Sequence, residues 1–367
     1  GDTWARYRRD PARSGFLPVP VGPKLRHGWT ADVGGRLTSP VIAGGKAVVA
    51  SIDTHTLHAF DSTGGRKAWQ FIAGGRVDSA PTLFQGRVLF GCCDGWIYCL
   101  DASSGELAWR FRAAPAERLH GADEQVESVW PVHGSILIEK GQIHAVAGRS
   151  RFTDGGLRLL RIDPFTGTKV SETVYDHRSR GTGHDLHRQF DRRFQSPEDR
   201  AKNIPMSFQD VGITDILCAE RGQVCMRTFL LDFDPSGAQP AKRPAGPMLR
   251  VPFGLLDPTW SHRVGWMRWP GPASRILVFD PDERVFGYGF HIRYQVLNTF
   301  DHYLYARSLH GREARSLWPD QKLPMFVTAM ALAGNMLCLA GPPDLEIIDH
   351  PEIYKRAAEP EFQETLI

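Results

Sequence analysis

The sequence lacks the segments and motifs that mark membrane-spanning chains and several common enzyme classes. No apolar run reaches the roughly 20 residues that a membrane-spanning helix needs. Gly-x-Ser-x-Gly elbows, Walker loops, His-Glu-x-x-His zinc motifs and Gly-x-Gly-x-x-Gly fingerprints after a strand are all missing. A signal peptide is missing as well, although the abrupt opening at Gly1-Asp2-Thr3-Trp4 is typical of a processed or engineered terminus. These absences favour a binding protein over a catalyst and leave the cellular compartment open.

The chain also has little excess charge of either sign. Its 44 Lys and Arg against 41 Asp and Glu give a formal net charge of +3. The stretch 177–202 holds seven basic and four acidic residues, so it accounts for the whole excess. The remainder is neutral in sum, which argues against a broad basic face for nucleic acid. We therefore expect no nucleic-acid partner.

Cysteine is scarce and its spacing excludes the familiar cysteine motifs. None of the six cysteines forms Cys-x-x-Cys or a Cys-x-x-Cys-His haem site. Cys99, Cys225 and Cys338 stand in apolar, strand-like runs, which predicts buried thiols that act as small hydrophobic side chains.

Glycine and proline are plentiful instead, at 37 and 26 residues, which indicates many short strands separated by turns. Residues 36–71 and 76–111 form two copies of one repeat. Its anchors stand 40 residues apart: Asp61 and Asp101, Trp69 and Trp109, Phe71 and Phe111. Each copy holds four β-prone runs with turn signals between them, such as Asp94-Gly95. Four antiparallel strands per repeat of about 40 residues predict a β-propeller blade.

Weaker copies follow along the chain. We expect strands of a third blade at 135–139, 143–147 and 156–168, of a fourth at 213–217, 223–226 and 228–233, of a fifth at 275–280, 284–290, 303–307 and 315–318, and of a sixth at 326–333 and 335–340. The predicted fold is an all-β propeller of about six to seven four-stranded antiparallel blades, the last one incomplete.

The predicted organisation has three parts. Residues 36–341 form the blades, with a basic insert at 177–202, and residues 342–367 form an irregular C-terminal tail. Residues 1–35 contain Leu25–Ala31, which is similar to the runs around Trp69 and Trp109 and predicts an outer strand that closes the ring. Because the last blade is incomplete, we expect a propeller shortened at its C-terminal end or one that closes irregularly.

The repeat resembles the pyrroloquinoline-quinone-like (PQQ-like) propeller repeat, which includes quinoprotein dehydrogenases and the outer-membrane assembly lipoprotein BamB. The signature of that family is Ala-x-Asp-x-x-Thr-Gly-x-x-x-Trp. It is matched by Ala59, Asp61, Gly65 and Trp69 in the first repeat, by Asp101, Gly105 and Trp109 in the second, and by Asp163, Thr166 and Gly167 in the third, where Arg161 and Ser171 replace the outer residues. The resemblance implies that each tryptophan docks between adjacent blades.

More narrowly, three segments resemble planctomycete-type PQQ-like proteins, a group without a settled activity. They are Glu127–Gly134, Trp260–Arg263 and Leu339–Asp344. Fold by itself does not transfer function.

Two groups of residues invite a cofactor or metal hypothesis. Alcohol-oxidising quinoproteins carry a disulfide between adjacent cysteines against their cofactor, and Cys92-Cys93 is such a pair. Its surroundings do not match that site, and no set of Glu, Asn and Asp ligands for Ca²⁺ is evident. The pair therefore either contacts PQQ or fills a tight hairpin with small side chains.

A second group, in the basic insert, consists of His177, His184, His187 and Asp191. These residues either bind a metal or lie in a solvated loop, and we expect no metal site.

A second candidate site follows from the repeat register, because propellers bind ligands and partners near the channel mouth. The residues expected there are Arg36, Arg76, Asp78, Glu127, Trp130, His262 and Arg263. Arginine beside aromatic residues suits recognition of carboxylates or carbonyls. Alternatively, Arg36 and Arg76 pair with acids of neighbouring blades and only hold the ring together.

The resulting hypothesis is a non-catalytic propeller that binds a protein partner or an extended ligand through its channel face. We expect it in the cell envelope, as a periplasmic or secreted protein. The alternatives are a PQQ-dependent alcohol or sugar dehydrogenase with PQQ and Ca²⁺ as cofactors, or the propeller module of a larger enzyme.

Overall fold

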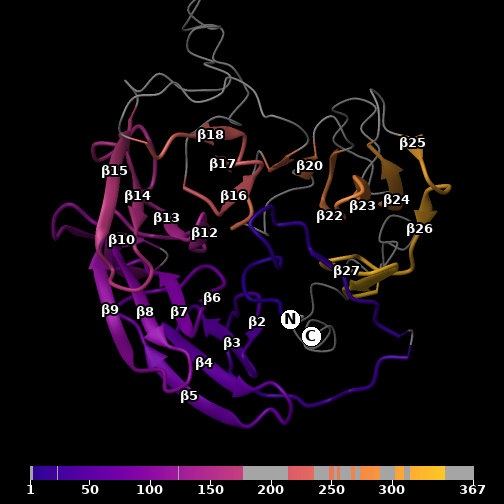
Figure 1. Cartoon of the computed structure of the whole chain (residues 1–367), viewed down its shortest axis with the longest axis horizontal. Coiled ribbons are helices and arrows are strands. Elements are labelled where there is room, and N and C mark those ends of the chain that lie inside the picture. Colours follow the sequence, from indigo (N-terminus) through magenta and orange to yellow (C-terminus); the bar gives the residue numbers. More distant parts are fainter. Residues whose placement is uncertain are drawn as a thin grey trace, which may run out of the picture. The chain divides into compact units, whose positions relative to one another are not determined.

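The computed structural model describes residues 3–22, 24–122, 124–176, 214–234, 248–251, 254–256, 266–268, 273–289, 302–309 and 315–343. Every regular element in these ranges is a β-strand, as the sequence predicted (Figure 1). Across the same ranges there is accordingly no helix that could cross a membrane. The predicted basic insert at 177–202 lies outside the described residues, as does the predicted tail beyond Pro343.

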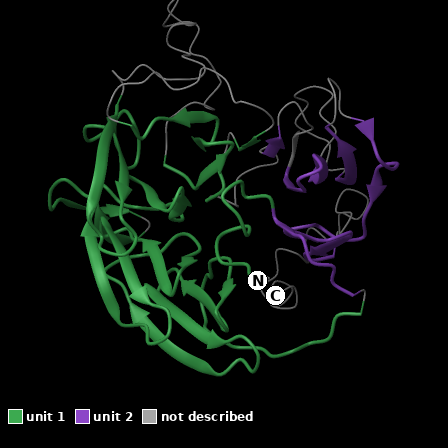
Figure 2. Cartoon of the chain, viewed as in Figure 1, with its two compact units in different colours: residues 1–14, 24–259 green, residues 15–23, 260–367 purple. Residues whose placement is uncertain are grey.

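The chain divides into two compact units (Figure 2). Unit 1 comprises residues 1–14 and 24–259, and unit 2 comprises residues 15–23 and 260–367. Together the described strands form six blades, four in unit 1 and two in unit 2.

Three consecutive blades of unit 1 have four strands each, and in each blade the strand order follows the chain. The first blade consists of β2 (Val41–Ala43), β3 (Lys46–Ser51), β4 (Thr56–Asp61) and β5 (Lys67–Ile72). The second consists of β6 (Thr82–Phe84), β7 (Arg87–Gly91), β8 (Trp96–Asp101) and β9 (Leu107–Arg112). The third consists of β12 (Leu137–Glu139), β13 (Gln142–Ala147), β14 (Leu157–Ile162) and β15 (Lys169–Tyr175).

The fourth blade is smaller, and a separate hairpin precedes the third. The fourth blade pairs β16 (Leu217–Glu220), β17 (Gln223–Met226) and β18 (Phe229–Leu231), and β19 (Leu249–Arg250) follows them in unit 1. The strand predicted at 213–217 in fact runs from Leu217 to Glu220. Between the second and third blades stands the hairpin of β10 (Leu119–Ala122) and β11 (Gln125–Ser128).

Unit 2 holds the fifth and sixth blades. The fifth pairs β22 (Ile276–Phe279), β23 (Arg284–Gly289), β24 (Tyr303–Ser308) and β25 (Arg315–Ser316), and β26 (Gln321–Lys322) also pairs with β24. Nearby in the chain, β20 (Trp266–Arg268) pairs with β21 (Ala273–Ser274). In the sixth blade β27 (Ala329–Ala333) pairs with β28 (Met336–Ala340) and, in parallel, with β1 (Phe16–Leu17).

The N-terminal strand is therefore not the one that the sequence predicted. Residues 25–31 contain no strand, whereas β1 at Phe16–Leu17 joins the sheet of the last blade. A strand needs a partner for its backbone groups, and Leu332 N donates to Gly15 O at 2.9 Å while Gly334 N donates to Leu17 O at 2.8 Å. Closure of a complete ring stays a prediction.

The core lies between neighbouring blades. One buried cluster combines Val48 and Leu57 of the first blade with Val88 and Leu100 of the second. Further clusters join the second blade to the third and the third to the fourth. Since both faces of a middle strand are covered in this way, β4 and β8 read as apolar runs rather than as an alternation.

The tryptophans of the repeat link each blade to the next by one recurring contact. The indole Nε1 of Trp29 donates to Ser62 O at 3.0 Å, that of Trp69 to Ala102 O at 3.0 Å, and that of Trp109 to Pro164 O at 3.2 Å. In the third blade Ser171 stands in the tryptophan position. Its hydroxyl donates to Phe233 O at 3.2 Å, so the hydrogen bond to the next blade is kept without the indole.

The corner that receives each indole is built by the aspartate and glycine of the repeat. In the second blade the Asp101 carboxylate accepts hydrogen bonds from Ser103 N at 2.9 Å and Ser104 N at 3.1 Å. Gly105 follows at φ +76°, and a Cβ there would stand 2.6 Å from Cδ2 of Trp69. Only glycine meets both conditions, which explains the spacing Asp-x-x-x-Gly-x-x-x-Trp.

The first residues of the chain run along the innermost strands of unit 1. Trp4 bridges Ile42 of β2, and the Leu83 amide of β6 donates to Ala5 O at 2.7 Å. Farther on, the Ala219 amide of β16 donates to Pro11 O at 2.8 Å. We call residues 4–13 the inner strap. It provides partners for edge strands whose backbone groups would otherwise lack them.

Candidate functional site

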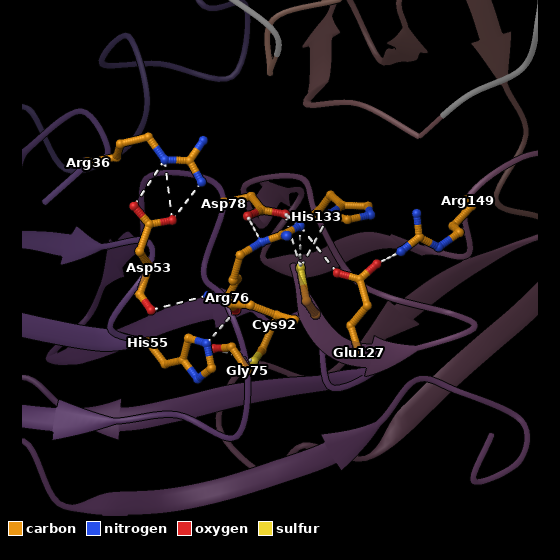
Figure 3. A network of polar contacts seen from close by, with 12 residues as sticks. Arg36, Asp53, His55, Gly75, Arg76, Asp78, Cys92, Glu127, His133 and Arg149 are labelled. Atoms are coloured by element: carbon orange, nitrogen blue, oxygen red, sulfur yellow. Dashed lines mark hydrogen bonds and ion pairs between the residues drawn. The ribbon is translucent and has the colours of Figure 1, made fainter. Parts of the chain in front are cut away.

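Turns and connecting segments of the second and third blades bring a polar cluster together at one end of these blades (Figure 3). Arg76 and Asp78 lie in the segment that leads into β6, and Cys93 lies in the turn after β7. Glu127 belongs to β11, and His133 lies in the segment that leads into β12. We call this end of unit 1 the loop face.

Backbone hydrogen bonds hold these segments in place. Cys93 N donates to Arg76 O at 2.9 Å, and Ser128 N donates to Cys93 O at 2.8 Å. Val132 N donates to Cys92 O at 3.0 Å. The cysteine turn is thus bonded on one side to the segment of Arg76 and on the other to the segment that carries His133, so the side chains between them have fixed positions.

Arg76 forms the centre of a buried ion network. Its Nε donates to Asp78 Oδ1 at 3.0 Å, and its Nη2 lies 3.2 Å from Glu127 Oε2. The side chains of Arg76 and Glu127 are only 4% and 2% exposed. Arg149 forms a second ion pair with Glu127. Two acids and two bases therefore neutralise one another inside the protein, which buried charges require.

Next to this network, Asp78, Cys93 and His133 place three different ligand atoms close together. His133 Nδ1 lies 2.5 Å from Asp78 Oδ2, and Cys93 Sγ donates to the same oxygen at 3.0 Å. Cys93 Sγ also lies 3.4 Å from His133 Nδ1. Both neighbours of the imidazole thus contact Nδ1. A nucleophile–base–acid relay would need them on opposite ring nitrogens, so this arrangement is not a catalytic triad.

The protonation states also argue against a nucleophilic cysteine. Burial raises the pKa of the Cys93 thiol far above its ordinary value, and the negative charge of Asp78 raises it further. Burial alone would raise the pKa of Asp78 as well, but its hydrogen bonds and its attraction to His133 lower it below the usual range. At neutral pH the sulfur is a thiol and the carboxyl is ionised, and a thiol is a weak nucleophile.

Cys92 faces away from this trio. Its Sγ donates to Gly75 O at 3.3 Å, and its side chain is part of the core between the first and second blades. Both cysteines are free thiols without exposed surface. The pair therefore does not fit contact with a planar quinone, which needs sulfur atoms presented to an open site. Small side chains that fill a tight turn describe the pair better.

The two remaining predicted site residues that the structure describes, Arg36 and Trp130, take no part in this cluster. Arg36 binds Asp53 through two nitrogens, at 3.0 and 2.6 Å, in a solvent-exposed pair outside the cluster. Trp130 is buried, and its indole donates to Asp154 O at 2.9 Å. His262 and Arg263 lie outside the described residues.

Of the seven predicted site residues, the structure thus brings three together: Arg76, Asp78 and Glu127. Glu127 stands in the hairpin that precedes the third blade, so Arg76 pairs with an acid from beyond its own blade, whereas Arg36 pairs with Asp53 of its own blade. No pattern in the sequence pointed to His133 and Arg149, and none connected Cys93 with Asp78.

Comparison with known proteins places the repeat in a family. The family model described as outer membrane protein assembly factor BamB matches residues 25–197. These residues belong to the BamB-like, PQQ-like propeller repeat. The match includes the three tryptophan contacts and the whole polar cluster, so the cluster is built on the family's repeat.

The curated relatives that this chain matches are larger proteins. The dehydrogenase subunit of the quinone alcohol dehydrogenase of Gluconobacter oxydans is 26% identical over 184 residues, which cover 45% of this chain and 23% of that protein. The corresponding subunit of Komagataeibacter europaeus is 25% identical over 184 residues, which cover 45% of this chain and 24% of that protein. The chain therefore spans about a quarter of the length of these relatives.

Solved structures similar to this chain include a quinohemoprotein alcohol dehydrogenase and BamB. The quinohemoprotein alcohol dehydrogenase of Comamonas testosteroni has a TM-score of 0.38 at 18% identity, covering 50% of this chain and 28% of that chain. BamB of Moraxella catarrhalis has a TM-score of 0.29 at 21% identity, covering 37% of this chain and 40% of that chain.

Proposed function

We propose that this chain is a non-catalytic PQQ-like propeller that binds a partner protein or another extended ligand through the loop face of unit 1, in the cell envelope. The observation that carries the proposal is the hairpin β10–β11, which is fixed by polar contacts on one face and presents apolar side chains on the other. The cell-envelope location rests on the description of the family as an outer membrane assembly factor.

The pairing of the hairpin defines its two faces. Leu119 pairs with Ser128, and Gly121 pairs with Val126, so Leu119 and Val126 share one face. These two side chains are 60% and 67% exposed. Residues of a strand alternate between faces, and a hairpin that follows the usual pattern turns its apolar face inward. The reversed pattern here supports a recognition surface.

The opposite face of the hairpin is anchored in two places. Gln125 Oε1 lies 2.6 Å from His55 Nε2, and Gln125 Nε2 donates to Asp53 O at 3.3 Å, which connects the hairpin to the first blade. Glu127 connects it to Arg76 and Arg149. An apolar pair on an anchored hairpin loses little conformational entropy when a partner covers it, which favours binding.

The ionisable groups of the loop face support the absence of catalysis in this proposal. Arg76, Asp78 and Glu127 are engaged with one another, and Cys93 is held as a thiol. A general acid, base or nucleophile needs a side chain that can reach a substrate, and Arg76 and Glu127 are only 4% and 2% exposed.

A crosslinking experiment tests the proposal. A photoreactive amino acid is placed at Val126, or at Ile72 as the control, because both side chains are 67% exposed but Ile72 lies on the outer strand β5. In native envelope, the Val126 probe should capture a distinct protein that the Ile72 probe does not. Leu119→Asp should abolish this capture. Capture by both probes, or background alone, would contradict the proposal.

The second candidate is a quinone-dependent dehydrogenase, which the alcohol dehydrogenase relatives favour. The purified chain is mixed with micromolar PQQ and Ca²⁺, and the absorbance of bound quinone and dye-linked oxidation of alcohols and sugars are measured. Our proposal predicts neither binding nor oxidation. Binding would support the dehydrogenase, and the full reading frame would show whether this propeller is a module of a longer enzyme.

A further inference from the structure

We propose that Asp78, Cys93 and His133 form a binding site for a borderline-soft divalent cation, for which Zn²⁺ is the model ligand. The three side chains come from the segment before β6, the turn after β7 and the segment before β12. Their ligand atoms all lie within 4.8 Å of one another. The site does not depend on the proposed partner binding.

The distances between the ligand atoms are close to those of a tetrahedral zinc site. Bonds of about 2.3 Å to sulfur, 2.0–2.1 Å to nitrogen and 2.0–2.2 Å to oxygen place the ligand atoms about 3.3–3.6 Å apart. The 3.4 Å between Cys93 Sγ and His133 Nδ1 already meets this spacing. Asp78 Oδ2 lies 3.0 Å from the sulfur and 2.5 Å from the nitrogen. To reach that spacing it would move roughly 0.3–0.6 Å farther from the sulfur and roughly 0.8–1.1 Å farther from the nitrogen.

The chemistry of the ligand atoms selects the kind of metal. A thiolate with an imidazole suits zinc and similar ions, whereas Mg²⁺ and Ca²⁺ prefer sites built from oxygen alone. Three protein ligands leave a fourth position for water. The side chains of Asp78 and His133 keep 17% and 15% exposure, so that position can be reached from solvent.

The surroundings orient the carboxylate for this role. Arg76 Nε donates to Asp78 Oδ1 at 3.0 Å, while Oδ2 faces the sulfur and the imidazole. A hydrogen bond of this kind fixes the direction of a metal ligand. The thiol proton of Cys93 passes to solvent when the metal binds, so binding adds one net positive charge beside Arg76. We therefore expect a weaker site than one with four thiolates.

The adjacent cysteines provide a matched pair of variants. Cys93→Ser removes a ligand, whereas Cys92→Ser changes a neighbouring buried thiol that contacts Gly75 O. Zinc stoichiometry is measured by elemental analysis after dialysis, and Co²⁺ is titrated in to observe the near-ultraviolet sulfur-to-cobalt charge-transfer band. Wild type and Cys92→Ser should bind one Zn²⁺ per chain and show the band. Cys93→Ser should lose the band. His133→Ala removes a direct ligand and should weaken binding by more than the roughly 10- to 100-fold that loss of an outer hydrogen-bond partner of a ligand costs.

If the variants fail to fold, an experiment on wild-type protein alone tests whether Cys93 is a metal ligand. Because Cys93 is buried, its alkylation requires local opening of its turn, and excess Zn²⁺ should slow this reaction further, as mapped by mass spectrometry. Alkylation of the partly exposed Cys338 should not change. A wild type without the cobalt band, or a band that Cys93→Ser retains, would overturn the proposal. Equal protection of both cysteines would do so as well.

Discussion

At the scale of the residue, the corner glycines show how the absence of a Cβ atom lets a tryptophan of the preceding segment pack closely against the corner. Gly105 has φ +76°, and its missing Cβ leaves the room that the Trp69 ring fills. The same relation holds between Gly65 and Trp29 and between Gly167 and Trp109. Because the contact needs both the positive φ and the absence of a side chain, these glycines identify in the sequence the positions where neighbouring blades meet.

Gly105→Ala and Gly45→Ala together separate these two requirements. Gly45 has nearly the same φ of +74° but no atom within 4 Å of an added Cβ. We expect Gly45→Ala to destabilise the protein by about 1–2 kcal/mol through backbone strain. Gly105→Ala should lose about 1–3 kcal/mol more because the methyl group overlaps the indole. Urea unfolding followed by tryptophan fluorescence measures the difference, and equal losses would refute the overlap.

At the scale of the element, the inner strap holds strands that lie far apart in the sequence. Three strand amides, those of Ile42, Leu83 and Ala219, donate to carbonyls of the strap at 2.7 to 2.8 Å. Each belongs to the innermost strand of a different blade. A backbone amide at a sheet edge is protected only while it has such a partner, so the strap determines how stable these edges are.

Deletion of residues 1–14 should therefore speed amide exchange at these three positions. Each amide loses its acceptor, and the loss of about 1.4 kcal/mol per hydrogen bond corresponds to roughly tenfold faster exchange. Hydrogen–deuterium exchange with mass spectrometry measures this. Leu332 is the control, because its amide donates to Gly15 O, which the deletion retains. Unchanged exchange around Ile42, Leu83 and Ala219 would show that the strap does not protect them.

At the scale of the whole molecule, the repeated corner carboxylates couple stability to pH. Backbone hydrogen bonds from Gly64 and Thr63 lower the pKa of Asp61, and those from Thr166 and Phe165 lower that of Asp163. Hydrogen bonds from Ser103 and Ser104 do the same for Asp101. A pKa lower in the folded than in the unfolded state adds stability that is present above the unfolded value and is lost as the pH falls.

We expect the free energy of unfolding to fall as the pH drops from about 5 to about 3, an interval that contains the ordinary aspartate pKa, and to go on falling below it. The variant with Asp61, Asp101 and Asp163 replaced by Asn keeps an acceptor oxygen at each corner but cannot titrate there. It should lose less stability over this interval than wild type does. Asp215 opposes the trend, since burial raises its pKa and its contribution declines as the pH rises. Parallel pH profiles of variant and wild type, measured by chemical unfolding, would contradict this account.

The sequence predicted the blades well because the repeat is encoded locally. Asp101, Gly105 and Trp109 stand at a fixed spacing, and each has its structural role within one corner or against the next. The metal-ligating trio has no such signal. Asp78, Cys93 and His133 lie on connections of two blades, and only the packing of those blades brings them together. The inner strap escaped prediction because it acts through backbone hydrogen bonds, which its residue types do not reveal.

Ser171, in place of a tryptophan, affects the junction between the third and fourth blades. A tryptophan side chain buries about 150–250 Å² and a serine far less. The junction after the third blade therefore has the hydrogen bond of the Ser171 hydroxyl but lacks the buried indole ring found at the earlier junctions. Under mechanical load, that junction should be the first to open. The chain also leaves β15 at this junction for the basic stretch 177–202, so the junction without a tryptophan coincides with the place where extra sequence is inserted into the repeat.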